Sequence, residues 1–161
     1  MAALSADLNV SVVGSAITVP MPAIGADIFY RGAVIYIDPT GYVTPAGSAG
    51  ARIAGICPRQ QTTTAAGQLV EILVFGFVWL PIATTLALAD VGSVLYMDSA
   101  DQTDNPVDAL NQEDTAIAAS DAMVGRILTL GPTAGSSPTQ MLIHVGGNYT
   151  GSLGTGAGTW S

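Results

Sequence analysis

The chain has 161 residues, which is enough to bury the core of one domain but too few for two ordinary domains. Its formal net charge is −8 and its only cations are four arginines, so we expect it to bind neither nucleic acid nor acidic membrane surfaces, which both attract clustered Lys and Arg. It contains 19 glycines and no lysine, and this composition favours sheet over helix.

The N-terminal residues 1–24 precede the first regular strand pattern and carry scattered apolar side chains. They end in Pro20-Met21-Pro22, which resists strand pairing except at the edge of a sheet. No basic region precedes the first apolar residues and Asp7 interrupts them, so we expect no signal peptide. We expect an extended arm whose removal leaves the remainder folded. Its apolar residues are Leu4, Leu8, Val10, Val12, Ile17, Val19 and Met21.

Residues 31–47, RGAVIYIDPTGYVTPAG, predict a β-hairpin with a turn at Asp38-Pro39-Thr40-Gly41. The pattern around this hairpin occurs twice in the chain, each time as a glycine-opened strand, a short apolar run around a glycine and a longer closing strand. The matching segments are 32–38 with 92–98, 52–56 with 122–126, and 70–76 with 140–146. The first pair is offset by 60 positions and the other two by 70, so the second copy has gained about ten residues.

We therefore predict an all-β domain over residues 25–146, a small β-barrel or β-sandwich built from two similar three-stranded units. The most apolar stretch, residues 69–83, is interrupted by Glu71, Gly76 and Pro81 and is too short to be a transmembrane helix. The intervening residues 81–90 fit either one or two helical turns or a plain crossover. We expect residues 147–161 to form a flexible Gly-rich tail.

Residues 70–79 are apolar on both faces of a strand, since one face carries Val70, Ile72 and Val74. The opposite face carries Leu73, Phe75, Phe77 and Trp79. A small barrel has one interior, so one of these faces must contact something else. Two alternatives stay open: a loop or arm of the same chain covers the aromatic face, or that face is an oligomer interface. We predict the interface.

Side chains capable of catalysis are scarce, because the chain has one histidine, one cysteine and no lysine. His144 lies in the closing strand of the second copy and fits a strand residue better than a general base. Cys57 has no partner for an internal disulfide and fits a small buried residue better than a nucleophile. We expect no enzyme activity and no cofactor.

Three further patterns suggest ligands only weakly. The acidic stretch of residues 98–114 lacks the ligand order and central glycine of an EF-hand, so we expect a solvated loop rather than a metal site. Residues 154–158, GTGAG, lack the following helix and lysine of a phosphate loop. Asn148-Tyr149-Thr150 matches a glycosylation sequon by coincidence if no secretory signal is present.

The order of these segments resembles the capsid cement, or head decoration, proteins of tailed bacteriophages. The resemblance spans residues 25–145 and consists of patterns of glycine, apolar residues and turns. It is carried by YRGAVIYIDPTGYVTP (30–45), IAGI (53–56), AGQLVEILVFG (66–76), DVGSVLYMD (90–98) and MVGR (123–126). The long Gly-rich tail departs from the simplest members of that group.

The resemblance implies a structural protein of the virion that is assembled in the host cytoplasm and binds the outer face of the capsid. Its partners are then the major capsid protein and copies of itself, with a homotrimer favoured, as in phage lambda, and a dimer next. In that group the N-terminal arm often docks on the capsid. By this resemblance, Leu4, Leu8, Val10, Val12, Ile17, Val19 and Met21 contact the capsid.

A second function class remains open. Exposed tryptophan and tyrosine rings on a β-sandwich also suit a carbohydrate-binding or host-surface-binding module of a virion, because aromatic faces stack on sugars. Convergence of Trp79 and Trp160 with tyrosines beside acids on one open face favours that module. Burial of these rings at subunit contacts favours the decoration protein.

Overall fold

The computed structural model describes residues 6–46, 52–81, 91–92, 94–97, 122–131 and 140–146. Leu4, the acidic stretch 98–114, residues 82–90 and the tail 147–161 lie outside these ranges, so the expectations about them stay predictions. Within the ranges the chain forms strands and turns without helix, which confirms the all-β prediction. The strands are β1 (Ser11–Pro22), β2 (Asp27–Phe29), β3 (Val34–Ile37), β4 (Val43–Thr44), β5 (Arg52–Ile56), β6 (Gln61–Thr63), β7 (Leu69–Pro81), β8 (Val94–Met97), β9 (Ala122–Gly131) and β10 (Gln140–Val145).

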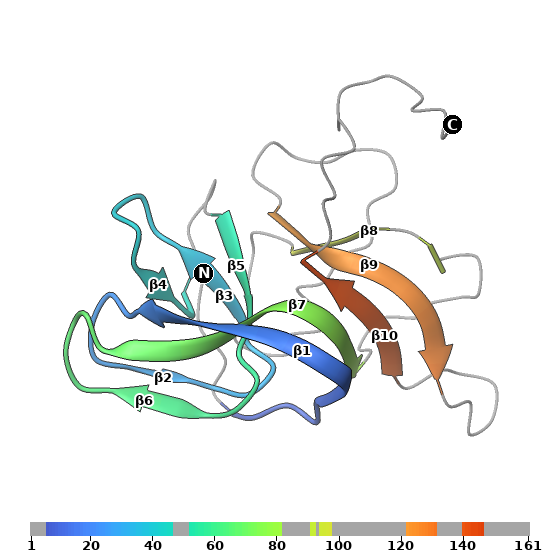
Figure 1. Ribbon diagram of the computed structural model, residues 1–161, viewed down its shortest axis with the longest axis horizontal. Coiled ribbons are helices and arrows are strands. Elements are labelled where there is room, and N and C mark those ends of the chain that lie inside the picture. The colour runs from blue at the N-terminus through green and yellow to red at the C-terminus, as the bar shows by residue number, and fades with distance from the viewer. Residues whose placement is uncertain are drawn as a thin grey trace, which may run out of the picture.

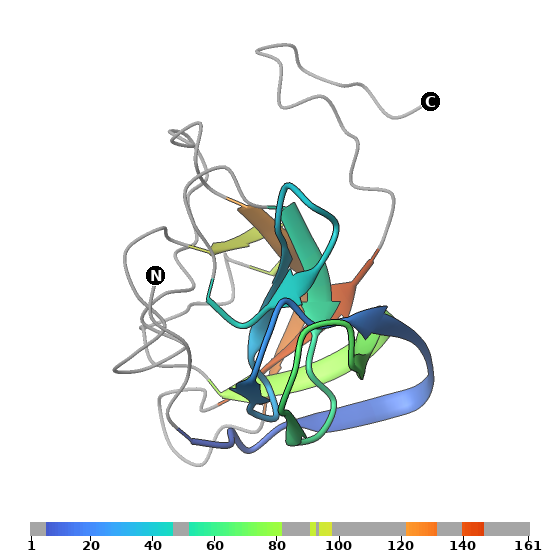
Figure 2. The same cartoon turned by 90° about the vertical axis from the view of Figure 1, so that its left-hand side faces the viewer.

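Eight of these strands form one antiparallel sheet in the order β4-β3-β5-β7-β10-β9-β8, with β1 paired to β7 outside this path. The sheet curls into a half-barrel, and the long strand β7 runs through its middle (Figures 1 and 2). The short strands β2 and β6 pair separately as a two-stranded sheet. Every strand pair is antiparallel, which suits connections made by hairpins and short loops.

The first hairpin turns where the sequence predicts. The Gly41 N–H donates to the Asp38 carbonyl at 3.0 Å, and the Asp38 N–H donates to the Tyr42 carbonyl at 2.8 Å. Gly41 has a φ of 90°, a conformation that suits glycine because a Cβ is strained there. The Asp38 carboxylate accepts hydrogen bonds from the Thr40 N–H at 3.0 Å and the Tyr42 N–H at 2.8 Å, and so fixes the turn.

The two sequence copies pair in the same register. In the first copy Val34 lies opposite Ile56 and Ile35 opposite Gly55, and an irregularity follows before Tyr36. In the second copy the corresponding residues pair in the same way, with the irregularity at the same place. Those pairs are Val94 with Arg126, Leu95 with Gly125 and Tyr96 with Met123. The duplication in the sequence is therefore a duplication of strand pairing.

Gly55 and Gly125 serve the same purpose in the two copies. A Cβ at Gly55 would collide with the carbonyl oxygen of Leu73, and a Cβ at Gly125 would collide with that of His144. Glycine is required at both places because the neighbouring strand backbone passes too close for any side chain. Ile56 pairs with Leu73 and Arg126 with His144, so the closing strands correspond at an offset of 71 rather than the 70 that the sequence suggests.

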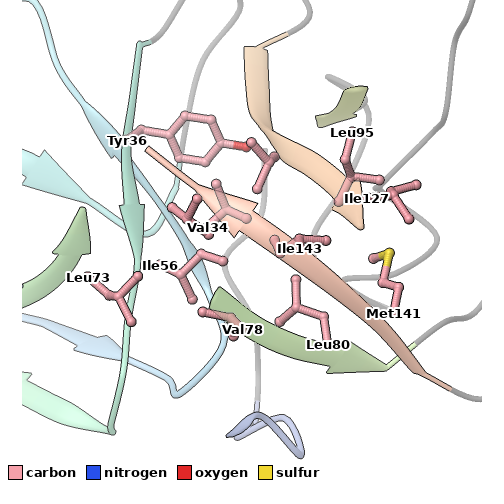
Figure 3. Packing of buried hydrophobic residues seen from close by; sticks show 12 residues of the cluster. Val34, Tyr36, Ile56, Leu73, Val78, Leu80, Leu95, Ile127, Met141 and Ile143 are labelled. Atoms are coloured by element: carbon pink, nitrogen blue, oxygen red, sulfur yellow. The ribbon is translucent and has the colours of Figure 1, made fainter. Parts of the chain in front are cut away.

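Two clusters of buried residues form the core. The first joins the two copies: Figure 3 shows Val34, Ile56 and Leu73 of the first copy in one cluster with residues of the second. Those second-copy residues include Leu95, Val124, Ile127, Met141 and Ile143. The second cluster contains residues of the first copy and of the segments around it: Ala23, Phe29, Ala33, Ile35, Val43, Cys57, Val70 and Ile72.

The copies turn opposite faces toward the shared core. Leu95 and Ile127 of the second copy belong to the first cluster. Ile35 and Cys57, which hold the same places in the first copy, belong to the second cluster. Because successive strand residues point to opposite sides, equivalent strands have their buried and outward faces exchanged.

The N-terminal segment is not a free arm over its described length. Residues Ser11–Pro22 form β1, which pairs with β7 from Ser11 opposite Trp79 to Pro22 opposite Leu69 (Figure 1). Ahead of β1, the Leu8 N–H donates to the Arg31 carbonyl at 2.9 Å, and the Arg31 Nε–H donates back to the Leu8 carbonyl at 3.0 Å. The expectation of an extended arm is therefore wrong for residues 8–22, because main-chain pairing and apolar contacts hold them in the fold.

Candidate interaction surfaces

The described residues hold no constellation that suggests catalysis. Cys57 is fully buried, and its Sγ lies 2.9 Å from the Arg59 carbonyl oxygen. Burial raises the pKa of the Cys57 thiol, which keeps it protonated and a poor nucleophile. In the described ranges, no three His, Cys, Asp or Glu side chains gather closely enough to hold a metal ion. The part of the chain that the structure describes also has no helix long and apolar enough to cross a membrane.

His144 lies in an aromatic cluster. Its ring stacks on Phe77 with the ring centres 4.9 Å apart and meets Phe75 edge-on at 5.0 Å. Both phenylalanines come from β7, and Phe77 lies directly opposite His144 in the β7–β10 register. Three aromatic rings from two neighbouring strands therefore pack together.

The aromatic cluster is the centre of an apolar surface on the outward side of the sheet, which we call the outer face. Strand pairing places Val13 opposite Phe77, Ile17 opposite Phe75, and Trp79 opposite Leu142. Side chains opposite each other in antiparallel strands project to the same side. The outer face therefore consists of Val13, Ile17, Phe75, Phe77, Trp79, Leu142 and His144, with Arg126 opposite His144 at its border.

The members of the outer face differ in exposure. Ile17 is 57% exposed and Phe77 is 38% exposed, which is high for large apolar side chains in a β-sheet. Trp79 is half-buried because its indole ring lies over Gly131, where a Cβ would collide with the ring atoms. Trp79 is thus partly covered by the same chain, whereas Phe75 and Phe77 are exposed.

Leu73 does not belong to this surface, although the sequence pattern groups it with Phe75, Phe77 and Trp79. It is only 1% exposed and packs in the first core cluster. The strict alternation on which the grouping depends breaks between Thr18 and Ile17, where the β1–β7 register shifts by one residue beside Val74. A bulge of this kind moves the following residues to the other face of the strand. Leu73 is therefore a core residue.

The predicted capsid contacts of the N-terminal segment also divide between core and surface. Leu8 and Met21 pack on the second core cluster, and Val10 packs on the first. Val19 is half-buried opposite Ile72. Val12 and Ile17 are exposed and remain free to contact another protein. Leu4 lies outside the described residues.

Sequence reasoning missed Val13, Leu142 and His144 as members of the outer face. Each becomes a member because it pairs across a strand with Phe77 or Trp79. The repeat placed His144 in the closing strand of the second copy, but it did not show that this strand pairs with the closing strand of the first. The register itself depends on bulges that the sequence pattern does not reveal.

A second surface feature is the free edge of β1. Among the described residues β1 pairs only with β7, so one side of its 12-residue main chain has no strand neighbour. Proteins avoid long open edges unless they use them, because such edges recruit further strands. This edge is the other candidate site.

Comparison with known proteins finds no match for this chain among family models, curated proteins or solved structures.

Proposed function

We propose that this protein is a structural decoration protein that binds the outer surface of a tailed-phage head and stabilises the shell. Its partners are the major capsid protein and other copies of itself, with a homotrimer favoured over a dimer. The resemblance in sequence motifs supports this proposal. The all-β fold and the two candidate surfaces suit it, because a cement protein needs rigid contact surfaces rather than reactive side chains.

The observation that carries the proposal is the open edge of β1. Across β7, the Glu71 N–H donates to the Gln61 Oε1 at 2.7 Å, and the Glu71 carbonyl accepts from the Gln61 Nε2 at 2.9 Å. The main-chain groups of Glu71 therefore face away from β1. Pro20 lies opposite Glu71, so the two form a non-hydrogen-bonded pair. In such a pair each residue points its main-chain groups away from the other, so those of Pro20 point to the open edge.

Two prolines close the C-terminal end of this edge. Pro22 is two residues beyond Pro20 in an unbroken register, so it faces the same way. Proline has no N–H, so a strand that approaches Pro20 and Pro22 finds no donor. Thr18 occupies the next position of the same type, opposite Leu73, and keeps its N–H. The part of β1 from Ser11 to Thr18 is thus open to an added strand.

Strand addition suits a capsid contact. Main-chain hydrogen bonds supply affinity without charged side chains, and alternate side chains supply specificity. A single short strand binds weakly, but an oligomer that engages several sites on one shell gains avidity from effective concentration. A protein with a net charge of −8 and few cations is suited to contacts of this type.

The test uses heads of the phage that encodes this chain. Heads made without the protein should lose DNA at a lower temperature than wild-type heads, and addition of the purified protein should restore their stability. Electron microscopy should then show added density on the outside of the shell. Heads of unchanged stability, or no added density, would refute the proposal.

A Thr18→Pro variant tests the edge itself. The substitution removes an N–H that faces away from β7, so the β1–β7 hydrogen bonds remain and the fold is expected to persist. We expect binding to heads to weaken at least about tenfold. Thr18→Val, which keeps the N–H and the β-branched shape, is the matched control and should bind normally. Circular dichroism and the melting temperature check the fold of both variants, and equal binding by both would remove the edge from the proposal.

The alternative, a carbohydrate-binding or host-surface-binding module, has less support. Trp79 is half-buried over Gly131, and the described part of the outer face carries no acid beside its aromatic rings. Trp160 lies outside the described residues. A sugar-binding screen on the purified protein tests this alternative directly.

A further inference from the structure

The internal duplication allows each face of the second copy to be compared with the equivalent face of the first copy. Among the described residues, one face of the second copy is uncovered although the equivalent face of the first copy is buried. In the first copy, one face carries Ile35 and Ile72 and is covered by residues of the second cluster such as Phe29. The other face carries Ile56 and Leu73 and is covered by the second copy through the first cluster. Both faces of the first copy are therefore buried.

Among the described residues, only one face of the second copy is covered. Its Leu95 and Ile127 pack against the first copy. Its other face carries Arg126 and His144, which pair with each other as Ile56 and Leu73 pair in the first copy. This is the outer face. The face that is buried between the two copies at Ile56 and Leu73 therefore points outward at the equivalent residues of the second copy, Arg126 and His144.

The charge of the outer face fits contact between copies of one acidic chain. The described acids Asp7, Asp27, Asp38 and Glu71 all lie outside it, and Glu71 is held in an ion pair by Arg59 at 2.8 Å. A chain of net charge −8 repels its own copies, and contact is least unfavourable where acids are missing. The outer face combines that property with an apolar centre of the kind found in subunit interfaces.

We propose that the outer face of one chain is covered by a second copy of this chain in solution. The contact is centred on Phe77 and His144 and extends to Val13 and Ile17. It deepens the oligomer part of the proposed function but stands without any capsid, because it concerns the purified protein alone. It also differs from the interface expected from the sequence, since Leu73 is excluded and residues of β1 and β10 are added.

Sedimentation equilibrium of the purified full chain tests the proposal. The wild type should form oligomers at micromolar concentration. Phe77→Gln should weaken association at least about tenfold, because truncating a central aromatic side chain commonly removes much of the affinity. Ile28→Gln is the matched control: Ile28 is 38% exposed, as Phe77 is, but it lies on β2, which pairs with β6 and contributes no residue to the outer face, so its substitution should leave association unchanged.

A second variant guards against misfolding. Ile17 is the most exposed member of the outer face, so Ile17→Gln should weaken association while leaving the melting temperature unchanged. A wild type that is monomeric throughout the concentration range would overturn the proposal. So would oligomers that neither substitution weakens.

A shortened chain that ends at Gly146 tests the main competing explanation, in which residues 147–161 of the same chain cover the outer face. If the full chain is monomeric and the shortened chain associates, residues 147–161 of the same chain cover the outer face and the proposal is wrong. Thr18→Pro keeps the outer face intact, so unchanged head binding with normal association would refute the edge contact while leaving this proposal standing.

Discussion

Asp38 shows how a single side chain fixes a turn in this fold. Its carboxylate accepts hydrogen bonds from the Thr40 hydroxyl and from the N–H groups of Thr40 and Tyr42. The Thr40 hydroxyl has the largest influence and lowers the pKa of Asp38; desolvation, the next largest, raises it, and the main-chain N–H groups of Tyr42, Thr40 and Gly41 lower it, so the net shift of the pKa is downward. The charged form of Asp38 is therefore the form that holds the hairpin.

This gives a prediction about acid. A carboxyl whose pKa is lower in the folded chain than in the unfolded chain stabilises the fold above its unfolded pKa, and that contribution is lost as pH falls through the folded pKa. Asp38→Ala should therefore lower the melting temperature at neutral pH, and its difference from the wild type should shrink below about pH 4. Asp38→Asn keeps an acceptor oxygen, so its melting temperature at neutral pH should lie between those of Asp38→Ala and the wild type. A difference that stays constant down to about pH 2.5 would contradict this account.

At the scale of elements, β1 behaves as part of the sheet although its sequence resembles an arm. It pairs with β7 from Leu69 to Trp79. Met21 in this strand and Leu8 ahead of it pack on the second core cluster. Gly32 leaves room for this segment, because a Cβ there would collide with the side chains of Val10 and Leu8. Main-chain pairing and apolar burial together make the segment part of the folding unit.

Deletion of residues 1–22 should therefore destabilise the protein. We expect a loss of at least about 2 kcal/mol in the free energy of unfolding, because β7 loses a paired neighbour and core residues lose their cover. Urea unfolding followed by circular dichroism measures this loss. A chain lacking only residues 1–5 keeps β1 and all of its described contacts and is the control. A stable fold after the longer deletion would restore the arm interpretation.

The sequence predicted the strands of this fold better than their faces. The paired copies could be found because glycine, apolar residues and turns recur in the same order in both copies, and the structure pairs them residue by residue. The placement of Leu73 could not be predicted, because Val74 has no partner in β1 and this one extra residue reverses which side chains face inward. Pro20 and Pro22 were correctly taken as signs of a sheet edge, but the sequence did not show that the edge belongs to this sheet.

At the scale of the whole molecule, the described acids and the apolar outer face are separated. The chain carries 12 acids and four arginines, yet the outer face holds no described acid, and Arg126 at its border donates to the Gly92 carbonyl at 2.7 Å. Association through that face should therefore depend on apolar burial, with long-range repulsion between the acidic copies acting against it.

The dependence of association on salt tests this separation. Raising NaCl from about 50 mM to about 500 mM shortens the screening length from roughly 14 Å to roughly 4 Å, which weakens the repulsion between copies but leaves apolar burial in place. We expect the dissociation constant from sedimentation equilibrium to stay constant or to fall. If ion pairs joined the copies, the same change in salt would raise the dissociation constant, and that result would show that residues outside the acid-free outer face hold the oligomer together.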